Sequence, residues 1–328
     1  MIRIVVLYML FALTFILGKM ALFYLAPIFF ISIRMILAGF FLILYLFMYN
    51  RKALRFDTPL FLHYSAVVLF HIYGAYILEF VALQHMNASR AALLYSFFPF
   101  MTYLLSVMIK EERLHVGKLL SMGIGFLGIV LLCCSSKVGS AAFGSIAGHN
   151  LWYDVLLLGS VVCAAIGWII FRLLVNRHGH SYVFLNGMSM LVAGIMALGT
   201  SYGLGEQYWY VSEWTWTTFG WCMFYLLLVI GIANCVCYNL YGYLLTRFSS
   251  SLIALAGFLC PLFSVIWGNV LLGETCSIHF VVAFILVSIG LVGFYCAERG
   301  LGVRQACSFF FYQSLTMTKS CLAYLTTW

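Results

Sequence analysis

Long apolar runs dominate this chain, and they restrict its fold more than any other feature of the sequence. Ten runs can be followed along it, and each has about the 20 residues that a helix needs to cross roughly 30 Å of hydrocarbon. They cover residues 4–24, 28–49, 60–83, 91–109, 116–134, 152–174, 182–201, 218–244, 252–272 and 279–297. The sequence therefore predicts an all-α membrane protein with ten transmembrane helices.

Composition excludes the soluble classes of protein. Only 8% of the 328 residues are charged, whereas a soluble domain has about 25%, so the chain lacks the material for a water-facing shell. Strands of an outer-membrane barrel alternate apolar and polar residues over about 10 positions, unlike these continuous runs. The same apolar content excludes a disordered chain.

The minor features of the sequence predict no further chemistry. The run 4–24 is long and no small-residue cleavage site follows it before Pro27, so it is a spanning helix rather than a signal peptide. The 11 cysteines lie mostly in apolar segments without a second pair at metal-ligand spacing, which is typical of core residues. We assign no metal to His178 and His180, and no cofactor to the chain.

Lysine and arginine predict the orientation in the membrane. With a cytoplasmic N-terminus, the inner side carries nine of them, Arg3 included, and the outer loops carry two, Arg90 and Lys137. Ten helices then leave both termini in the cytoplasm. The net charge of +8 is therefore interpreted as an orientation signal and not as a nucleic-acid surface.

An internal repeat divides the chain. Residues 89–132 match residues 251–294 at a shift of 162, and a weaker echo pairs Met35 with Met190 and Gly39 with Gly194. The strongest pairs are Ser89 with Ser251, Pro99 with Pro261, Glu112 with Glu274 and Gly128 with Gly290. We expect a first five-helix repeat at 1–134, a linker at 135–151, a second repeat at 152–297 and an interfacial or loosely ordered tail at 298–328.

The odd number of helices in each repeat has a geometric consequence. The second repeat enters the membrane from the opposite side, so the two repeats are inverted, as in secondary transporters that expose one midplane site to each side in turn. Pro99 and Pro261 each remove a helix hydrogen bond. Such a break can serve as a hinge or simply as a packing kink. Glu112 and Glu274 are expected to cap helices or to pair with basic neighbours.

Glu79 is the one acidic residue well inside a predicted helix, and a charge at that depth costs roughly 2.5 kcal/mol or more. Tyr76 lies three residues before it and His71 eight before, so the three side chains can share a helix face. The carboxylate could bind a cationic substrate group or carry a proton. It could also pair with Lys19 or Arg34, or lie exposed near the outer end of its helix.

Other residues have two interpretations each. Lys19 and Arg34 could capture a substrate carboxylate or form a gating pair, or they could extend to the membrane surface. His71 could titrate or be a hydrogen-bonded core residue. Trp168, Asn234, Tyr238 and Trp267 could line a cavity for an aromatic or purine-bearing ligand, or they could be core packing.

The sequence resembles the drug/metabolite transporter superfamily, in its EamA-like ten-helix type. The resemblance rests on Gly18 to Leu22, on Arg34 to Ala38, on the stretch from Ala82 to Ala92 and on the repeated Pro, Glu and Gly positions. It implies a secondary-active carrier of the bacterial inner membrane, with a central substrate cavity between inverted repeats. Glu79 departs from the family pattern, which usually has a neutral residue there, and the tail lies outside it.

Among the superfamily's members are exchangers of S-adenosylmethionine and S-adenosylhomocysteine and exporters of amino acids. One intramembrane carboxylate with an aromatic-rich interior favours the adenosyl compounds here, with amino acids or other small metabolites as the alternative. An ATP-driven pump is excluded, because Gly18-Lys19 and Gly117-Lys118 are not followed by Ser or Thr. An intramembrane enzyme and a channel stay open. The expected partners are a small molecule and membrane lipid, without nucleic acid, and a homodimer stays open.

Overall fold

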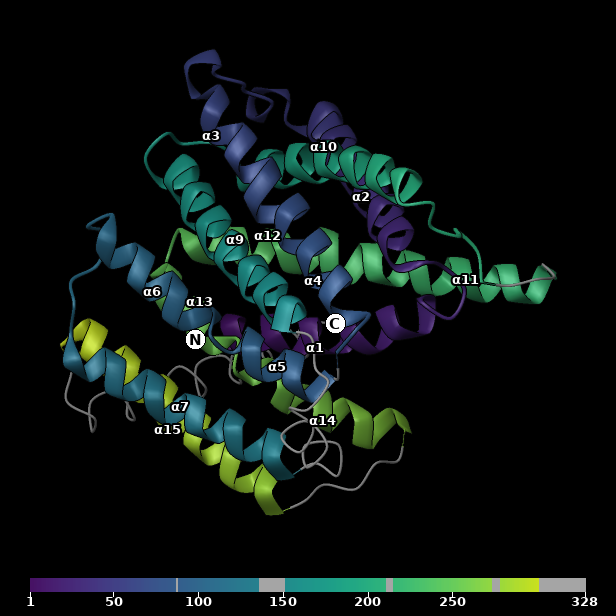
Figure 1. Cartoon of the computed structure of the whole chain (residues 1–328). Helices are drawn as coiled ribbons and strands as arrows, with labels where there is room; N and C mark the ends of the chain where they lie inside the picture. The colour runs from purple at the N-terminus through teal and green to yellow at the C-terminus, as the bar shows by residue number, and fades with distance from the viewer. Residues whose placement is uncertain (87, 136–150, 211–214, 273–277, 301–328) are drawn as a thin grey trace, which may run out of the picture.

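The computed structural model describes residues 1–86, 88–135, 151–210, 215–272 and 278–300 (Figure 1). Within them, ten helical spans are long and apolar enough to cross a membrane, and we number these spans 1 to 10 along the chain. The prediction of an all-α protein with ten transmembrane helices is confirmed, because each span falls on a predicted run. The predicted tail at 298–328 lies almost entirely outside the described residues.

The elements follow one another without a sheet in the described part of the chain. Spans 1 to 5 are built from α1 (Ile2–Ala21), α2 (Pro27–Tyr49), η1 (Arg51–Ala53), η2 (Thr58–Leu60), α3 (Phe61–Ala66), η3 (Val67–Gly74), α4 (Ala75–Leu83), α5 (Ala88–Tyr95), α6 (Phe98–Met108) and α7 (Val116–Ser135). Spans 6 to 10 are built from α9 (Leu151–Asn176), α10 (Tyr182–Gly203), α11 (Trp216–Val229), η4 (Ile230–Cys237), α12 (Tyr238–Leu245), α13 (Ser250–Ala256), α14 (Leu259–Leu272) and α15 (Ile278–Arg299).

Every second connection returns to the side of the bundle at which α1 begins. The connections 50–57, 109–115, 177–181 and 246–249 follow spans 2, 4, 6 and 8, so they share one membrane face if each span crosses once. We call this side the N-terminal face. It carries the excess of basic loop residues, which predicts that it is cytoplasmic.

Both helices that contain a repeated proline are interrupted. Span 4 divides into α5 and α6, with Pro99 in the first turn of α6. Span 9 divides into α13 and α14, with Pro261 in the first turn of α14. Proline suits this position because the first amides of a helix have no partner within the helix. The breaks are as the sequence predicts, while a hinge role for either proline stays a prediction.

Glycines allow α2 and α10 to pack backbone against backbone. A methyl group at Gly39 would lie 2.5 Å from the backbone nitrogen of Leu191, and one at Gly194 would lie 2.8 Å from that of Ile36. The two contacts are reciprocal, because Ile36 and Leu191 are 155 residues apart, as Gly39 and Gly194 are. The contact that span 2 makes with span 7 is therefore matched by the contact that span 7 makes with span 2.

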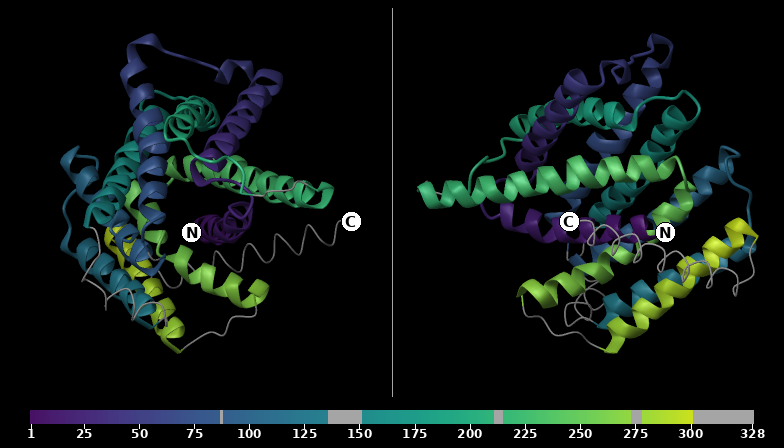
Figure 2. Two further views of the ribbon diagram at one scale, coloured as in Figure 1. Left: turned by 45° about the vertical axis from the view of Figure 1, so that its right-hand side comes forward. Right: turned by 180° about the vertical axis from the view of Figure 1, so that it is seen from behind.

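The pair α7 and α15 repeats this arrangement at the other side of the bundle, where the two helices run side by side (Figures 1 and 2). A methyl group at Gly128 would lie 2.9 Å from the carbonyl oxygen of Ala283, and one at Gly290 would lie 2.7 Å from that of Ser121. Here both members of the contact are related by the repeat shift of 162 residues. Small residues at such contacts are the usual means of joining helices in lipid.

The start of α2 is capped by a residue from the α10–α11 connection. The carboxylate of Glu206 accepts hydrogen bonds from the backbone amides of Ile28 (3.0 Å) and Phe29 (2.9 Å) and from the hydroxyl of Ser201 (2.6 Å). An anion is favourable at a helix N-terminus. Beside it, Tyr208 stacks on Phe29 with ring centroids 4.6 Å apart, which closes this end of spans 2 and 7.

The substitution Gly194→Ala tests the close contact of α2 with α10. We expect it to lower the free energy of unfolding by about 1–3 kcal/mol, because the added methyl group must push the α2 backbone away. The control is Gly199→Ala in the same helix, where nothing lies within 4 Å and alanine raises helix propensity. Thermal unfolding of the purified protein in detergent measures both, and equal melting temperatures for the two variants would contradict the contact.

Candidate functional site

Two π-helical segments lie at matching places in the two parts of the chain. They are η3 in span 3 and η4 in span 8, each eight residues long. Their starts, Val67 and Ile230, are 163 residues apart, close to the repeat shift of 162. Single π turns within α-helices occur frequently at functional sites. The two segments therefore mark the middle of the bundle as the place to look for a site.

A tyrosine pair joins the two spans just after their π segments. The hydroxyl groups of Tyr76 in α4 and Tyr238 in α12 form a hydrogen bond with each other. The two residues are 162 positions apart, so each is the repeat equivalent of the other. A contact between equivalent residues is expected on the axis that would relate two repeats. The pair therefore lies where the two parts of the chain meet.

Opposite charges lie beside the tyrosine pair. The guanidinium carbon of Arg34 in α2 is 5.0 Å from the ring centroid of Tyr76 and 5.3 Å from that of Phe30, a cation–π arrangement. The Arg34 side chain is buried, and its Nε atom has no hydrogen-bond partner. Glu79 follows Tyr76 by about one helical turn and is partly buried. We call Arg34, Tyr76 and Glu79 the polar cluster.

An aromatic cluster lies on the other side of Tyr238. The ring of His71 in η3 has its centroid 4.0 Å from that of Trp168 and 5.6 Å from that of Tyr238. Trp168 in turn stacks on Tyr241 at 3.8 Å. Gly167 makes this possible, because a methyl group there would lie 2.3 Å from the Cα atom of His71. We call His71, Trp168, Tyr238 and Tyr241 the aromatic cluster.

Two buried side chains near these clusters have polar atoms without a hydrogen-bond partner among the described residues. His71 is 2% exposed, and neither of its ring nitrogens has a hydrogen-bond partner in the described structure. Asn234 in η4 donates weakly to the sulfur atoms of Met35 (3.1 Å) and Met190 (3.8 Å), while its carbonyl oxygen has no partner. A buried polar atom without a partner costs about 1–3 kcal/mol. Such atoms are candidates for contacts with a bound molecule.

The clusters include most of the residues that the sequence singles out, but not all. Arg34, His71, Tyr76, Trp168 and Tyr238 come together, and Asn234 touches the α2 residue next to Arg34. Glu79 lies one helical turn from Tyr76 in the same helix. Lys19 is exposed at the end of α1. Trp267 is half-buried and donates from its indole nitrogen to the carbonyl oxygen of Met9, 3.0 Å away. Within the part of the chain that the structure describes, no hydrogen bond or ring contact joins Lys19 or Trp267 to the two clusters.

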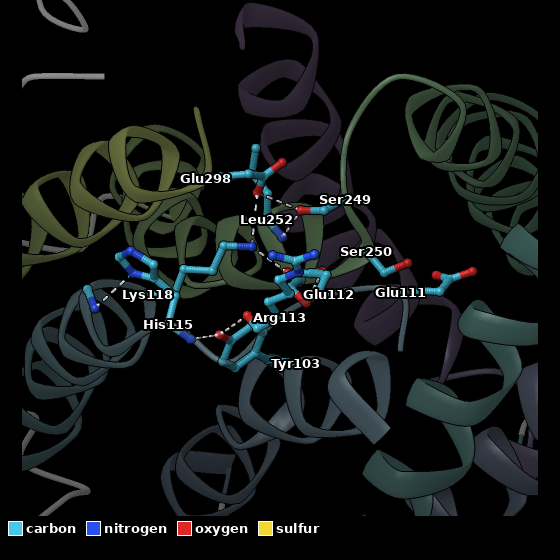
Figure 3. A network of polar contacts seen from close by, with 12 residues as sticks. Tyr103, Glu111, Glu112, Arg113, His115, Lys118, Ser249, Ser250, Leu252 and Glu298 are labelled. Carbon is cyan, nitrogen blue, oxygen red and sulfur yellow. Dashed lines mark hydrogen bonds and ion pairs between the residues drawn. The ribbon is translucent and has the colours of Figure 1, made fainter. Parts of the chain in front are cut away.

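A second concentration of polar residues lies at the N-terminal face (Figure 3). Lys118 at the start of α7 is buried, and its ammonium nitrogen is 2.5 Å from Glu112 and 3.9 Å from Glu298. The same ammonium lies over the rings of Tyr103 and Phe294, at 5.6 Å and 5.0 Å. The expectation that Glu112 pairs with a basic neighbour is confirmed. Its repeat equivalent, Glu274, lies outside the described residues.

These residues connect the first part of the chain to the second. The hydroxyl of Ser251 in α13 donates to Glu112 at 2.6 Å. Arg172 in α9 donates to Glu111 at 3.1 Å and to the hydroxyl of Ser250 at 3.5 Å. We call the whole set the N-terminal-face network: Glu111, Glu112, Lys118, Arg172, Ser249, Ser250, Ser251 and Glu298. It ties the α6–α7 connection to α9, α13 and α15.

Comparison with known proteins identifies the kind of protein to which this architecture belongs. The EamA-like transporter family matches residues 1–134 and 151–296. The chain belongs to the EamA-like transporter family. It is therefore a multi-pass membrane protein of a transporter family, as its ten spans require.

Relatives of known name support a small-molecule substrate. The S-adenosylmethionine/S-adenosylhomocysteine transporter of Chlamydia trachomatis serovar L2 is 28% identical over 291 residues, which cover 85% of this chain and 84% of the relative. That of Chlamydia muridarum is 28% identical over 292 residues, covering 85% and 86%. YvbV of Bacillus subtilis, named an uncharacterized transporter, is 24% identical over 277 residues, covering 83% of each chain.

The fold also has a counterpart among solved structures. One crystal structure superposes with a TM-score of 0.73 at 16% sequence identity and covers 91% of this chain and 96% of that chain. At this identity the likeness concerns the fold alone. The EamA-like arrangement of spans is thus found in an experimentally determined protein.

Two polar residues that link separate spans of this EamA-like protein are missing from the sequence predictions. Arg172 falls within the predicted run 152–174, and a charged residue in an apolar run is itself the signal that could have found it. Tyr8, whose hydroxyl donates to the carbonyl oxygen of Ile253 at 2.6 Å, carries no such signal. One tyrosine of the 21 in this chain does not stand out.

Removal of Lys118 tests the energetic weight of the N-terminal-face network. We expect Lys118→Met to lower the free energy of unfolding by about 3–5 kcal/mol, because Glu112 and Glu298 would be left without their cation. The control is Arg55→Gln, which breaks the Arg55–Asp57 pair whose arginine side chain is 67% exposed and which should cost at most about 1 kcal/mol. Denaturant or thermal unfolding in detergent compares them, and equal stabilities would contradict a buried, essential pair.

Proposed function

We propose that this protein is a secondary-active transporter that exchanges S-adenosylmethionine for S-adenosylhomocysteine across the bacterial inner membrane. The single observation that carries the proposal is the position of Arg34 and Glu79, two opposite charges within the bundle, beside an aromatic cluster. Charges within a membrane are costly and are mostly functional. The names of the chlamydial relatives support the same substrate.

The polar cluster suits the amino-acid end of such a substrate. An α-carboxylate can form two parallel hydrogen bonds with a guanidinium such as that of Arg34, whose Nε atom is unpartnered. An α-ammonium would pair with the carboxylate of Glu79. A zwitterion would therefore give each of these two charges a partner of opposite sign. In this proposal the two charges are complementary to the substrate and not only to each other.

The aromatic cluster suits the other end of the molecule. Trp168 and Tyr241 form a stacked pair next to His71, and a purine ring offers the same flat surface. The hydrogen bond between Tyr76 and Tyr238 joins the polar cluster to the aromatic cluster, and the sulfur of the substrate would fall beside this junction. A sulfonium cation gains from aromatic faces while a neutral thioether lacks the charge, so this pair would favour S-adenosylmethionine over S-adenosylhomocysteine.

We further propose that the two parts of the chain are inverted repeats that rock around this site. Two reciprocal pairs of close contacts support it. Gly39 and Gly194 approach a pair of residues that are 155 positions apart, as the two glycines are, and Gly128 and Gly290 approach a pair that is 162 positions apart, again like the two glycines. The π segments η3 and η4 and the prolines Pro99 and Pro261 are then the candidate hinges. Both termini would lie in the cytoplasm.

The N-terminal-face network would close one side of the carrier. Its bonds from Ser251 to Glu112 and from Arg172 to Glu111 span the two parts of the chain, so the site can open to this face only if they separate. In this proposal the conformation described is closed toward the cytoplasm. Opening would separate Glu112 from Ser251 and Lys118 from Glu298 and would expose Glu112 and Lys118 to water. Losing these partners costs less electrostatic energy in water than in a dry interface.

An exporter of amino acids is the second candidate function. Arg34 and Glu79 alone would bind any α-amino acid, whereas the aromatic cluster is superfluous for a small one. A channel would not exchange labelled for unlabelled substrate, and an enzyme would alter the compound. Competition of arginine, threonine and aromatic amino acids against labelled S-adenosylmethionine separates these possibilities.

Counterflow in proteoliposomes tests the substrate and the role of Glu79. Vesicles loaded with S-adenosylhomocysteine should accumulate labelled S-adenosylmethionine, and Glu79→Gln should reduce the uptake at least tenfold because the ammonium loses its counter-ion, worth about 1.4 kcal/mol or more. The control is Asp57→Asn, which neutralises a carboxylate outside the spans and should leave uptake unchanged. Full uptake by Glu79→Gln would remove Glu79 from the mechanism.

Hydrogen–deuterium exchange tests the closing role of the network. Arg172→Gln should speed exchange of the amides at 109–116 and 249–256, because the N-terminal face opens more often when its bonds to Glu111 and Ser250 are lost. The matched control is Asp154→Asn at the opposite end of α9, which breaks the pair with Arg90 and should leave these amides unchanged. The same exchange rates in both variants would show that the network does not close this face.

A further inference from the structure

An open groove lies at the N-terminal face, apart from the polar cluster and the aromatic cluster. It has a volume of about 650 Å³ and lies between α1, α2, α10 and the part of span 8 that η4 and α12 form. Its lining residues are Arg3, Phe41, Leu42, Tyr45, Tyr182, Val183, Cys235, Asn239, Leu240 and Tyr243. Neither the proposed transport site nor the N-terminal-face network includes any of them.

The depth of the groove corresponds to one leaflet of a bilayer. Arg3, Tyr182 and Tyr243 lie within the first or last turn of their spans, so they mark the membrane boundary. Cys235, at the inner end, precedes the end of α12 at Leu245 by ten residues, or about 15 Å at 1.5 Å per residue. That is roughly half of the 30 Å of hydrocarbon. The groove therefore runs from the interface to about the middle of the membrane.

Its wall faces lipid and its mouth is cationic. Phe41 and Tyr45 are 47% and 54% exposed on the outer surface of α2. At the mouth, Arg3 donates to the hydroxyl of Tyr243 at 2.7 Å, and the guanidinium carbons of Arg3 and Arg247 lie 5.3 Å and 5.9 Å from the centroid of that ring. Two cations thus converge on one interfacial tyrosine, at the level of lipid headgroups.

The inner part of the groove offers little to a polar metabolite. Asn239 is the polar residue there, and its amide is already engaged: its oxygen accepts from Asn186 at 3.0 Å and its nitrogen donates to the carbonyl oxygen of Cys235 at 2.8 Å. Leu42, Val183, Cys235 and Leu240 line this part of the groove beside it. The chemistry of the groove is therefore an anion-binding mouth over an apolar slot.

We propose that this groove binds one anionic phospholipid of the leaflet at the N-terminal face. Its phosphate lies between Arg3 and Arg247, and one acyl chain lies along Leu42, Val183 and Leu240. Basic pockets between transmembrane helices on the cytoplasmic side are suited to such headgroups, and each nearby cation strengthens their attraction. The bound lipid would join α2 and α10, which belong to different repeats, to α12.

Native mass spectrometry of the purified full-length protein tests the site. Titration with phosphatidylglycerol and, separately, phosphatidylcholine of the same acyl chains should show tighter binding of the former. The double variant Arg3→Gln and Arg247→Gln should weaken binding of phosphatidylglycerol about tenfold to thirtyfold and remove its advantage. The matched control is Arg51→Gln with Lys52→Gln, which removes the same charge from the same face outside the groove and should keep the advantage.

A second variant separates the apolar slot from the charges. Val183→Trp fills the slot without changing any charge and should weaken phosphatidylglycerol binding as well, while inorganic phosphate at millimolar concentration should not displace the lipid. Equal loss in both double variants would reduce the effect to surface charge and overturn the proposal. Displacement by free phosphate without an effect of Val183→Trp, or displacement by S-adenosylmethionine, would also overturn it. None of these outcomes depends on whether the protein transports that substrate.

Discussion

The cost of an unsatisfied polar group in hydrocarbon is the constraint on which this structure depends. Backbone amides and carbonyls satisfy one another within helices, which leaves the helix as the only regular element that these apolar runs can adopt. Polar side chains must then find partners inside the bundle. They gather at the tyrosine pair in its middle and at the N-terminal-face network. Both places join the first part of the chain to the second.

Close backbone contacts hold the scaffold around these polar places. Lipid tails are as apolar as the helices, so burial of apolar surface does not drive the helices together, and packing of small residues takes its place. The glycine contacts of α2 with α10 and of α7 with α15 have this character. They flank the middle of the bundle, where η3, α4, η4 and α12 carry the candidate site. A rigid periphery around a centre with two π segments is an arrangement that can hold a molecule and still change shape.

The candidate site was predictable to the extent that a residue type is unusual in its surroundings. Glu79 and Arg34 stand out because charges are rare in apolar runs, and both lie near Tyr76, with Arg34 over its ring and Glu79 one helical turn further along α4. Lys19 stands out for the same reason, yet it is exposed at a helix end, where its long side chain reaches the surface. Trp267 stands out by its residue type alone, and its indole donates to the α1 backbone. Arg172, like Glu79, is a charged residue within an apolar run, but it lies near the end of that run, where a charge is less conspicuous.

The sequence by itself determined that the chain is a ten-span membrane protein in which residues recur at a fixed shift. The length of an apolar run and the spacing of matching residues are properties of the sequence, so they are known without the tertiary structure. Only the tertiary structure decided that Tyr76 contacts Tyr238 and that Ser251 contacts Glu112. It also decided that two arginines share the ring of Tyr243. These pairs are 139 residues or more apart in the chain, except that of Arg247 with its neighbour Tyr243. Which helix faces meet is set by packing between spans, and no periodicity within one span contains that information.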